Sequence, residues 1–162
     1  MKRIVALVVL AVAVAVVASV ALAARDDHGR GNDKAHGRHG KVVHVIEHAT
    51  TDAVTNQGDG AGDVVGDVLT FTNDVFDKND AQKVGSDQGN CIRMTVGVSW
   101  ECVWTTFLSR GQITVEGPFY DTKDSVLAIT GGTGKFANAR GSMELKSRAG
   151  GAEFDFIFHL IG

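Results

Sequence analysis

The chain has 162 residues, with 16 Lys or Arg against 19 Asp or Glu and a formal net charge of −3 at pH 7. This length allows one domain with a single hydrophobic core. The charge balance offers no basic patch for nucleic acid, so we expect no nucleic-acid partner.

Residues 1–24 are typical of a secretory signal. Lys2 and Arg3 precede a long run rich in Ala, Val and Leu, and a small-residue A-x-A site ends at Ala23. We expect cleavage near Ala23 or Ala24 and a secreted or periplasmic protein, with an uncleaved membrane anchor as the alternative. Little ATP or NAD is expected outside the cytoplasm, which argues against a nucleotide ligand.

Residues 25–41 consist of glycine, charged residues and histidine with no apolar period. This composition predicts a disordered tether. His28, His36 and His39 fit no closed zinc site by their spacing, so we expect no metal centre there.

The remaining residues, 42–162, form the predicted folded domain, in which Val, Ile, Thr, Phe and Trp alternate with polar residues between Gly, Asn and Asp turns. The pattern predicts an all-β fold, either a sandwich or a closed barrel. We expect strands at 42–49, 64–76, 82–86, 90–96, 99–108, 111–117, 124–130, 139–147 and 152–161, of which one or two merge.

Two cysteines lie in the predicted domain. If Gly97-Val98 turns a hairpin, Cys91 and Cys102 share a face one diagonal step apart, and a shift of the turn by one residue brings them opposite. One interpretation is a disulfide, which an oxidising compartment would favour. The other is a free, buried Cys91 that lines a pocket, with Cys102 as small core filler.

The segment ITGGTGKF (129–136) is similar to a phosphate-binding loop. A P-loop, however, requires Gly at the position of Ile129 and Ser or Thr at that of Phe136. A dinucleotide fingerprint requires a following helix, and the pattern here predicts strand. We therefore expect a tight glycine turn with Lys135 in solvent and no nucleotide.

Several segments resemble known families. GQITVEGPFYDTKDSVLAITGGTGKF (111–136) resembles the signature region of plant allene oxide cyclases, as do GDVLTFTNDVF (66–76) and VGSDQGNC (84–91). GGTGKFANARG (131–141) is similar to a stretch of plant dirigent proteins. The resemblance covers about residues 42–161 and implies an eight-stranded antiparallel β-barrel, commonly trimeric, with an apolar cavity and no cofactor.

The resemblance also implies a function. The cyclases convert an unstable fatty-acid epoxide into a cyclopentenone by enclosing it, and dirigent proteins steer the stereochemistry of phenolic coupling. We therefore expect a secreted barrel that binds a small hydrophobic molecule, a lipid or a phenolic, and steers its cyclisation or coupling as an isomerase. Two alternatives are a carrier without catalysis and a packed structural barrel.

Three catalytic residues follow from the resemblance. Glu47 falls where the cyclases have a pocket glutamate that stabilises developing positive charge, and Asn73 matches a residue that helps to hold a water on the epoxide oxygen. Cys91 matches a pocket cysteine. The chain differs from the cyclases at Ala49, where a second water-holding Asn is missing, and at Thr55-Asn56, which replaces a Ser-Pro pair.

Four aromatic residues are the candidates for substrate binding. Strand alternation puts Trp100 and Trp104 on one face, and puts Phe71 on the face of Asn73. By the resemblance, Trp100 shapes the cavity and Phe119 takes the place of a Tyr. A barrel of about eight strands is just wide enough for side chains or one small ligand.

Overall fold

The computed structural model describes residues 40–60 and 62–161. The predicted signal, residues 1–24, lies outside the described residues, and so does the predicted tether except for Gly40 and Lys41. In the part of the chain that is described, no helix is long and apolar enough to cross a membrane.

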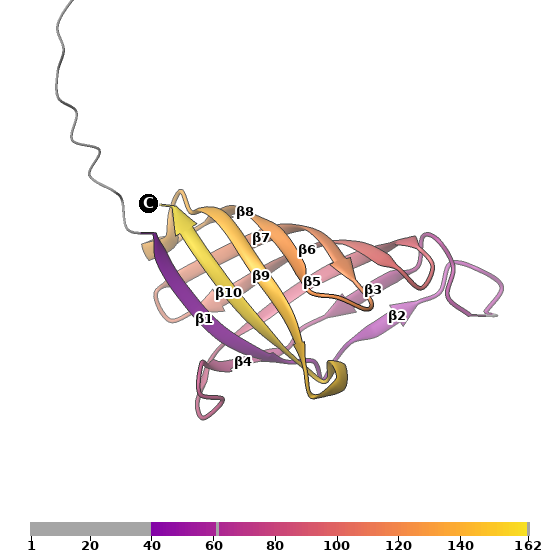
Figure 1. Cartoon of the computed structure of the whole chain (residues 1–162), viewed down its shortest axis with the longest axis horizontal. Coiled ribbons are helices and arrows are strands. Elements are labelled where there is room, and N and C mark those ends of the chain that lie inside the picture. Colours follow the sequence, from indigo (N-terminus) through magenta and orange to yellow (C-terminus); the bar gives the residue numbers. More distant parts are fainter. Residues whose placement is uncertain (1–39, 61, 162) are drawn as a thin grey trace, which may run out of the picture. The chain divides into compact units, whose positions relative to one another are not determined.

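The described residues are almost entirely strand (Figure 1). Two short 3-10 turns, η1 (Gly134–Phe136) and η2 (Ala149–Gly151), interrupt the strands. The strands are β1 (Lys41–His48), β2 (Ala53–Thr55), β3 (Val68–Phe71), β4 (Asp74–Asp77), β5 (Lys83–Thr95), β6 (Ser99–Leu108), β7 (Gly111–Tyr120), β8 (Ser125–Gly132), β9 (Arg140–Arg148) and β10 (Glu153–Ile161).

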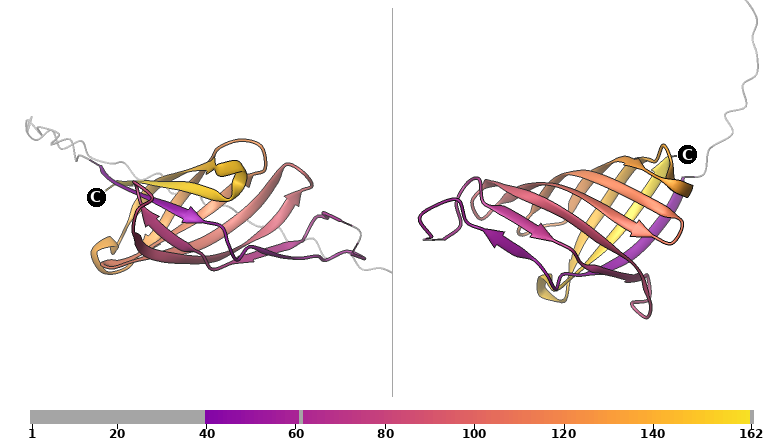
Figure 2. Two further views of the ribbon diagram at one scale, coloured as in Figure 1. Left: turned by 90° about the horizontal axis from the view of Figure 1, so that it is seen from below. Right: turned by 180° about the vertical axis from the view of Figure 1, so that it is seen from behind.

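The strands close into an eight-stranded antiparallel β-barrel. β1 pairs with β10 on one side and with β4 on the other, and β10, β9, β8, β7, β6 and β5 follow as neighbours. β3 and β4 pair with successive parts of β5 and so share one position in the barrel. β2 pairs only with β3, and the loop after it projects beyond the barrel (Figure 2). The predicted all-β barrel is confirmed.

In the structure one predicted strand divides, two merge as expected, and β2 lies outside the predicted strands. The predicted strand 64–76 divides into β3 and β4 at Thr72 and Asn73, although Asn73 still exchanges two backbone hydrogen bonds with Asp87 of β5. The predicted strands 82–86 and 90–96 are one strand, β5, whose glycines allow close approach to β6. A Cβ at Gly89 would lie 2.3 Å from the Cβ of Trp104, so this glycine is a packing requirement and not a turn.

The barrel interior is filled over most of its length by alternating strand residues. On β6, Trp100, Cys102, Trp104 and Thr106 are buried while the residues between them are more exposed. The rings of Trp104 and Phe156 lie 5.4 Å apart. Burial of this apolar surface is the main stabilising contribution to the fold.

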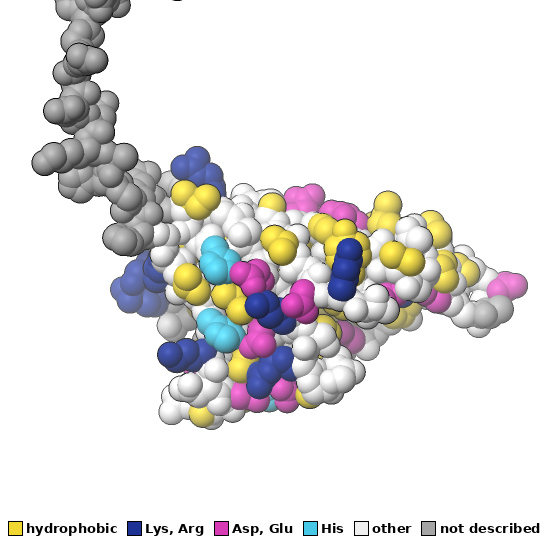
Figure 3. All heavy atoms as spheres, in the orientation of Figure 1, with side chains coloured by type: hydrophobic (Ala, Val, Ile, Leu, Met, Phe, Trp, Pro, Cys, Tyr) yellow, Lys and Arg dark blue, Asp and Glu magenta, His cyan; other side chains and the backbone are white. Residues whose placement is uncertain are grey.

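The outer face of β1, β10 and β9 carries charged cross-strand pairs. Figure 3 shows histidine, acidic and basic side chains gathered over these strands. His44 Nε2 lies 2.7 Å from Asp155 Oδ1, and His159 Nε2 lies 2.8 Å from Glu144 Oε1. These three strands therefore present apolar side chains to the interior and polar side chains to the outside, as is common in an antiparallel sheet.

Cys91 and Cys102 form a disulfide between β5 and β6. The two residues are direct cross-strand partners, because the register shifts by one residue between Arg93 and Thr95. Of the two interpretations that the sequence allows, the structure has the disulfide, so neither cysteine is a free thiol.

Candidate functional site

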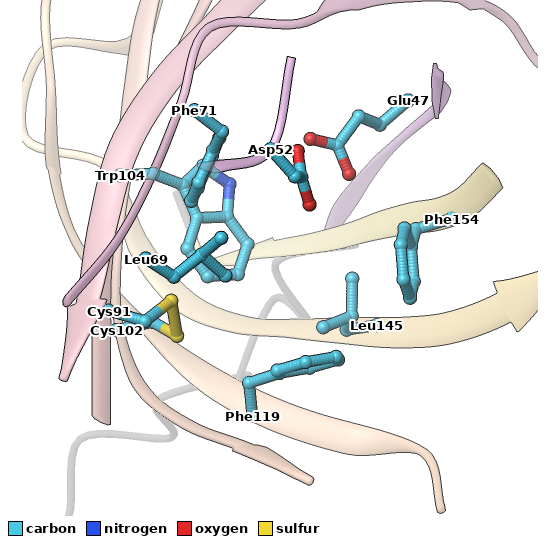
Figure 4. Close-up of a pocket in the computed structure, with 10 residues that line it drawn as sticks. All are labelled: Glu47, Asp52, Leu69, Phe71, Cys91, Cys102, Trp104, Phe119, Leu145 and Phe154. Carbon is cyan, nitrogen blue, oxygen red and sulfur yellow. A yellow bond between two sulfur atoms is a disulfide. The ribbon is translucent and has the colours of Figure 1, made fainter. Parts of the chain in front are cut away.

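A small cavity of about 50 Å³ lies inside the barrel wall (Figure 4). Aromatic rings and the disulfide form most of its lining, and carboxyl groups enter from one side. Its volume accommodates a few waters or the tip of a ligand, but not a whole lipid. The lining residues are Glu47, Asp52, Leu69, Phe71, Cys91, Cys102, Trp104, Phe119, Leu145 and Phe154.

A wider depression of about 490 Å³ adjoins the cavity. Asp52, Phe119, Leu145 and Phe154 line both spaces, so they form the throat between them. Phe119 and Phe154 meet edge to face, with ring centroids 5.8 Å apart. The depression adds Tyr120 at the end of β7 and the more polar loop 121–124. A ligand longer than the cavity therefore has a place for its remaining part.

Asn73 is the centre of the polar network behind the cavity. Its Nδ2 donates one hydrogen bond to Glu47 Oε1 and one to Asp52 Oδ1, each of 2.8 Å. Its Oδ1 accepts from the backbone N–H groups of Thr50 and Thr51 at 3.0 and 2.9 Å. An amide nitrogen has two N–H groups, and both are used here. The amide is thus held rigidly and has no donor left for a ligand.

Glu47 and Asp87 form a buried pair of carboxyl groups. Asp87 is completely buried, and its Oδ1 accepts from the backbone N–H of Asn73 at 3.1 Å. Burial, and then the negative charge of Asp87, raise the pKa of Glu47 to about 9. Burial also raises the pKa of Asp87 to about 7, although a hydrogen bond from Glu47 lowers it. At neutral pH the raised pKa keeps the Glu47 carboxyl protonated.

Three buried polar atoms near this pair have no hydrogen-bond partner among the described residues. They are Asp87 Oδ2, Thr106 Oγ1 and Trp104 Nε1. Thr106 is the direct cross-strand partner of Asp87. Buried groups are nearly always satisfied, so each of these atoms needs an explanation. A ligand acceptor in the cavity would satisfy the indole N–H.

The structure brings most of the predicted site residues together. Asn73 lies behind the cavity wall and contacts Glu47 instead of the open space. Five predicted residues line the cavity: Glu47, Phe71, Cys91, Trp104 and Phe119.

Trp100 does not reach this cavity. The guanidinium of Arg93 lies over its ring, 3.9 Å from the ring centroid, and its Nε1 donates to Asp121 Oδ1 at 3.1 Å. Trp100 therefore belongs to the cluster that joins two loops at one end of β6. Trp100 lies on the same, inward face of β6 as Trp104, as predicted. Alternation does not tell how far along the barrel a residue lies.

Sequence reasoning missed Asp87, Asp52 and Phe154. A signal for Asp87 was available, because a continuous β5 puts it on the same face as Cys91, four residues later. The predicted break between 86 and 90 concealed this. Asp52 lies in a loop outside the strands, and no periodic pattern points to it.

Comparison with known proteins places this site in a family context. The family model of allene oxide cyclase matches residues 42–162, which include every lining residue of the cavity.

Three solved structures share the barrel. One is a pyocyanin demethylase, with TM-score 0.62 and 25% identity over 73% of this chain and 100% of that chain. Another is a pterocarpan synthase dirigent protein, with TM-score 0.58 and 18% identity over 83% and 99% of the respective chains. A third is an exo-specific intermolecular Diels-Alderase, with TM-score 0.59 and 17% identity over 75% and 97%. The latter two are similar in fold alone.

Proposed function

This chain belongs to the allene oxide cyclase family, and from that premise we propose that it binds a small apolar molecule in the Glu47 cavity and steers its cyclisation or coupling. The ligand carries a hydrogen-bond acceptor at its reacting end. The signal-like residues 1–24 support action outside the cytoplasm, and the family resemblance supports a homotrimer. Solved barrels of this fold are named for different reactions, so the fold alone does not identify the reaction of this chain.

The buried Glu47–Asp87 pair is the observation that carries this proposal. The resemblance to the cyclases assigns Glu47 the role of a fixed negative charge. Burial and Asp87 raise its pKa far above neutrality, so a protonated Glu47 supports a different role, that of a proton donor. In an aromatic cavity such an acid would donate to a carbonyl, epoxide or ring-nitrogen acceptor.

The proposed chemistry is general acid catalysis with confinement. Glu47 donates its proton to the ligand acceptor, and this polarises the reacting bond. The cavity selects one folded conformer of the ligand for ring closure. The Asn73 amide, 2.8 Å from Glu47 Oε1, stabilises the carboxylate that remains. The proton returns to Glu47 when the product forms, so the cycle needs no external acid and is balanced for an isomerisation.

The site favours a substrate other than the plant epoxide. Both N–H groups of Asn73 are already bonded to Glu47 and Asp52, so it offers none to a substrate-bound water. Ala49, at the position of the second water-holding Asn of the cyclases, has no side-chain amide either. Direct contact between Glu47 and the ligand replaces a water-mediated one in this proposal.

The proposal gives the ligand an extended shape. The cavity of about 50 Å³ accepts only the reacting end, while the depression of about 490 Å³ beyond the Phe119–Phe154 throat accepts the rest. The indole N–H of Trp104 is a second donor for that end, because it is buried without a partner among the residues described. Two donors in an apolar space favour one orientation of the ligand.

The test begins with native mass spectrometry of the protein after exposure to a lipid and phenolic extract. A retained small molecule is then incubated with the wild type and with Glu47→Gln, and the products are separated by chiral chromatography. We expect Glu47→Gln to retain the ligand but to lose at least ten-fold in rate. The matched control is Glu116→Gln, an exposed glutamate on β7, which should leave rate and chirality unchanged.

Other results would overturn the proposal. Equal rates and product ratios for Glu47→Gln and wild type would remove the acid role. Retention of a ligand without any conversion by wild type would identify a carrier instead of a catalyst. A protein that retains no compound would favour the packed, structural barrel.

A further inference from the structure

We infer that His48, Asp80 and Glu153 form a binding site for a divalent transition-metal ion, for which Zn²⁺ is the best-suited candidate. One potential ligand atom from each residue lies within 4.8 Å of the others. His48 Nε2 and Asp80 Oδ1 are only 2.7 Å apart. All three residues are half-buried, so an ion can enter and keep water in its remaining positions.

Three different elements supply the ligands, and the fold fixes each one. His48 is the last residue of β1 and Glu153 the first of β10, and the two are direct cross-strand partners. Their side chains therefore leave the sheet on the same face. Asp80 comes from the turn between β4 and β5, where its positive φ of 58° and its N–H bond to Asp77 O at 2.8 Å define the turn.

The imidazole of His48 is oriented before any ion binds. Its ring stacks on Phe76, with centroids 4.1 Å apart and planes inclined by 17°. This contact holds the ring plane while Nε2 points at the Asp80 carboxylate. A ligand whose orientation is fixed by packing costs less to order when the metal binds.

The donor set decides the class of ion. One imidazole nitrogen and two carboxylate oxygens suit Zn²⁺, whereas an all-oxygen site would suit Ca²⁺ or Mg²⁺. Bonds of about 2.0–2.2 Å require the ligand atoms to draw closer than 4.8 Å, which the half-exposed Asp80 and Glu153 side chains can do by rotation. Arg148 Nη1 forms an ion pair with Glu153 Oε2 at 3.7 Å without a hydrogen bond, and the metal ion would compete with this arginine for the carboxylate.

The site is separate from the cavity. Strand alternation turns Glu47 toward the interior and its neighbour His48 outward, and it does the same for Phe154 and Glu153. The ion would therefore tie β1, β10 and the β4–β5 turn together behind the wall that carries Glu47 and Phe154. Its expected effect is on stability, with no direct part in the proposed reaction.

The same strand provides a matched control. His44 Nε2 lies 2.7 Å from Asp155 Oδ1, the same distance as in the His48–Asp80 pair. Within residues 40–60 and 62–161, only the His48 group brings three potential ligands together within 4.8 Å. A difference between the two histidines therefore tests the three-ligand site and not a general affinity of surface histidines for metal.

The experiment uses the full chain with His28, His36 and His39 replaced by Ala, so that the N-terminal histidines do not compete. After treatment with EDTA, titration calorimetry with Zn²⁺ should give one site per chain, and Zn²⁺ should raise the melting temperature. We expect His48→Ala, Asp80→Asn and Glu153→Gln each to weaken binding at least ten-fold. His44→Ala should leave it unchanged. Absence of Zn²⁺ binding by the parent, or equal losses for His44→Ala and His48→Ala, would overturn the inference.

Discussion

Asn73 Nδ2 donates a 2.8 Å hydrogen bond to Oε1 of Glu47, although 26 positions separate the two residues in the sequence. Both side chains are buried. The other N–H group of the same amide holds Asp52 at the throat of the cavity, and its oxygen holds the backbone of Thr50 and Thr51. A single amide in the break between β3 and β4 therefore positions both the proposed acid and the loop that follows β1.

Asn73→Ala should lower the free energy of unfolding by about 3 kcal/mol, because it leaves buried carboxyl and backbone groups without partners. Urea unfolding measures the loss. The control is Asn90→Ala on β5, a half-buried residue in the alternate, outward-facing position, which should cost less than about 0.5 kcal/mol. A loss below about 1 kcal/mol for Asn73→Ala would show that Asn73 does not organise the site.

Glu47→Gln should change the pH dependence of stability. The pKa of Glu47 rises from 4.5 to about 9 on folding, so the folded state binds a proton that the unfolded state releases. Its contribution is fully present below pH 4.5 and is lost as the pH rises through about 9. Even a third of this shift corresponds to about 2 kcal/mol. The variant should therefore gain stability relative to wild type by about 2 kcal/mol between pH 5 and pH 9.

Chemical unfolding of wild type and Glu47→Gln at several pH values measures this difference. Glu116→Gln, which changes an exposed carboxyl on β7, should follow wild type at every pH. If the difference between Glu47→Gln and wild type is the same at pH 5 and pH 9, Glu47 is not protonated in the folded protein.

The Cys91–Cys102 disulfide should contribute about 3 kcal/mol to stability, since it closes a loop of about a dozen residues in the unfolded chain. Addition of a reductant should shift the unfolding midpoint of wild type to lower denaturant concentration. The double variant Cys91→Ala, Cys102→Ala should not respond to reductant. An equal midpoint for reduced and oxidised wild type would contradict the prediction.

The fold was largely predictable from the sequence. Alternation predicts the strands, and the LAITGGTG segment carries the resemblance that predicts a closed barrel. The pairing of the cysteines was left open, because one residue in the register between Arg93 and Thr95 decides it. Local pattern does not report such a shift, since it depends on how β5 meets β6 across the barrel.

The site was predictable only in part. Glu47 and Asn73 were identified through the resemblance, but their mutual hydrogen bond was not, since it joins two segments through the tertiary fold. Asp87 was missed because it falls in the gap between the predicted strands 82–86 and 90–96, whereas Gly85 and Gly89 permit close contact of a continuous β5 with β6. The protonation of Glu47 follows from burial next to Asp87, and burial of a charged residue type is not visible in a strand pattern.

Arg93→Ala should separate the β2–β3 loop, which carries Asp63, from the β7–β8 loop, which carries Asp121, and lower stability by about 2 kcal/mol. Arg93 is buried, donates from Nε to Asp63 Oδ1 at 2.8 Å, and pairs through Nη1 with Asp121 Oδ2 at 2.7 Å. The half-exposed aspartates regain water when the cation is removed, which limits the loss. The fluorescence of Trp100 should also change, because the guanidinium over its ring is lost. Arg110→Ala, at an exposed position, should change neither signal, and an unaltered midpoint and emission for Arg93→Ala would show that the cluster does not hold the loops.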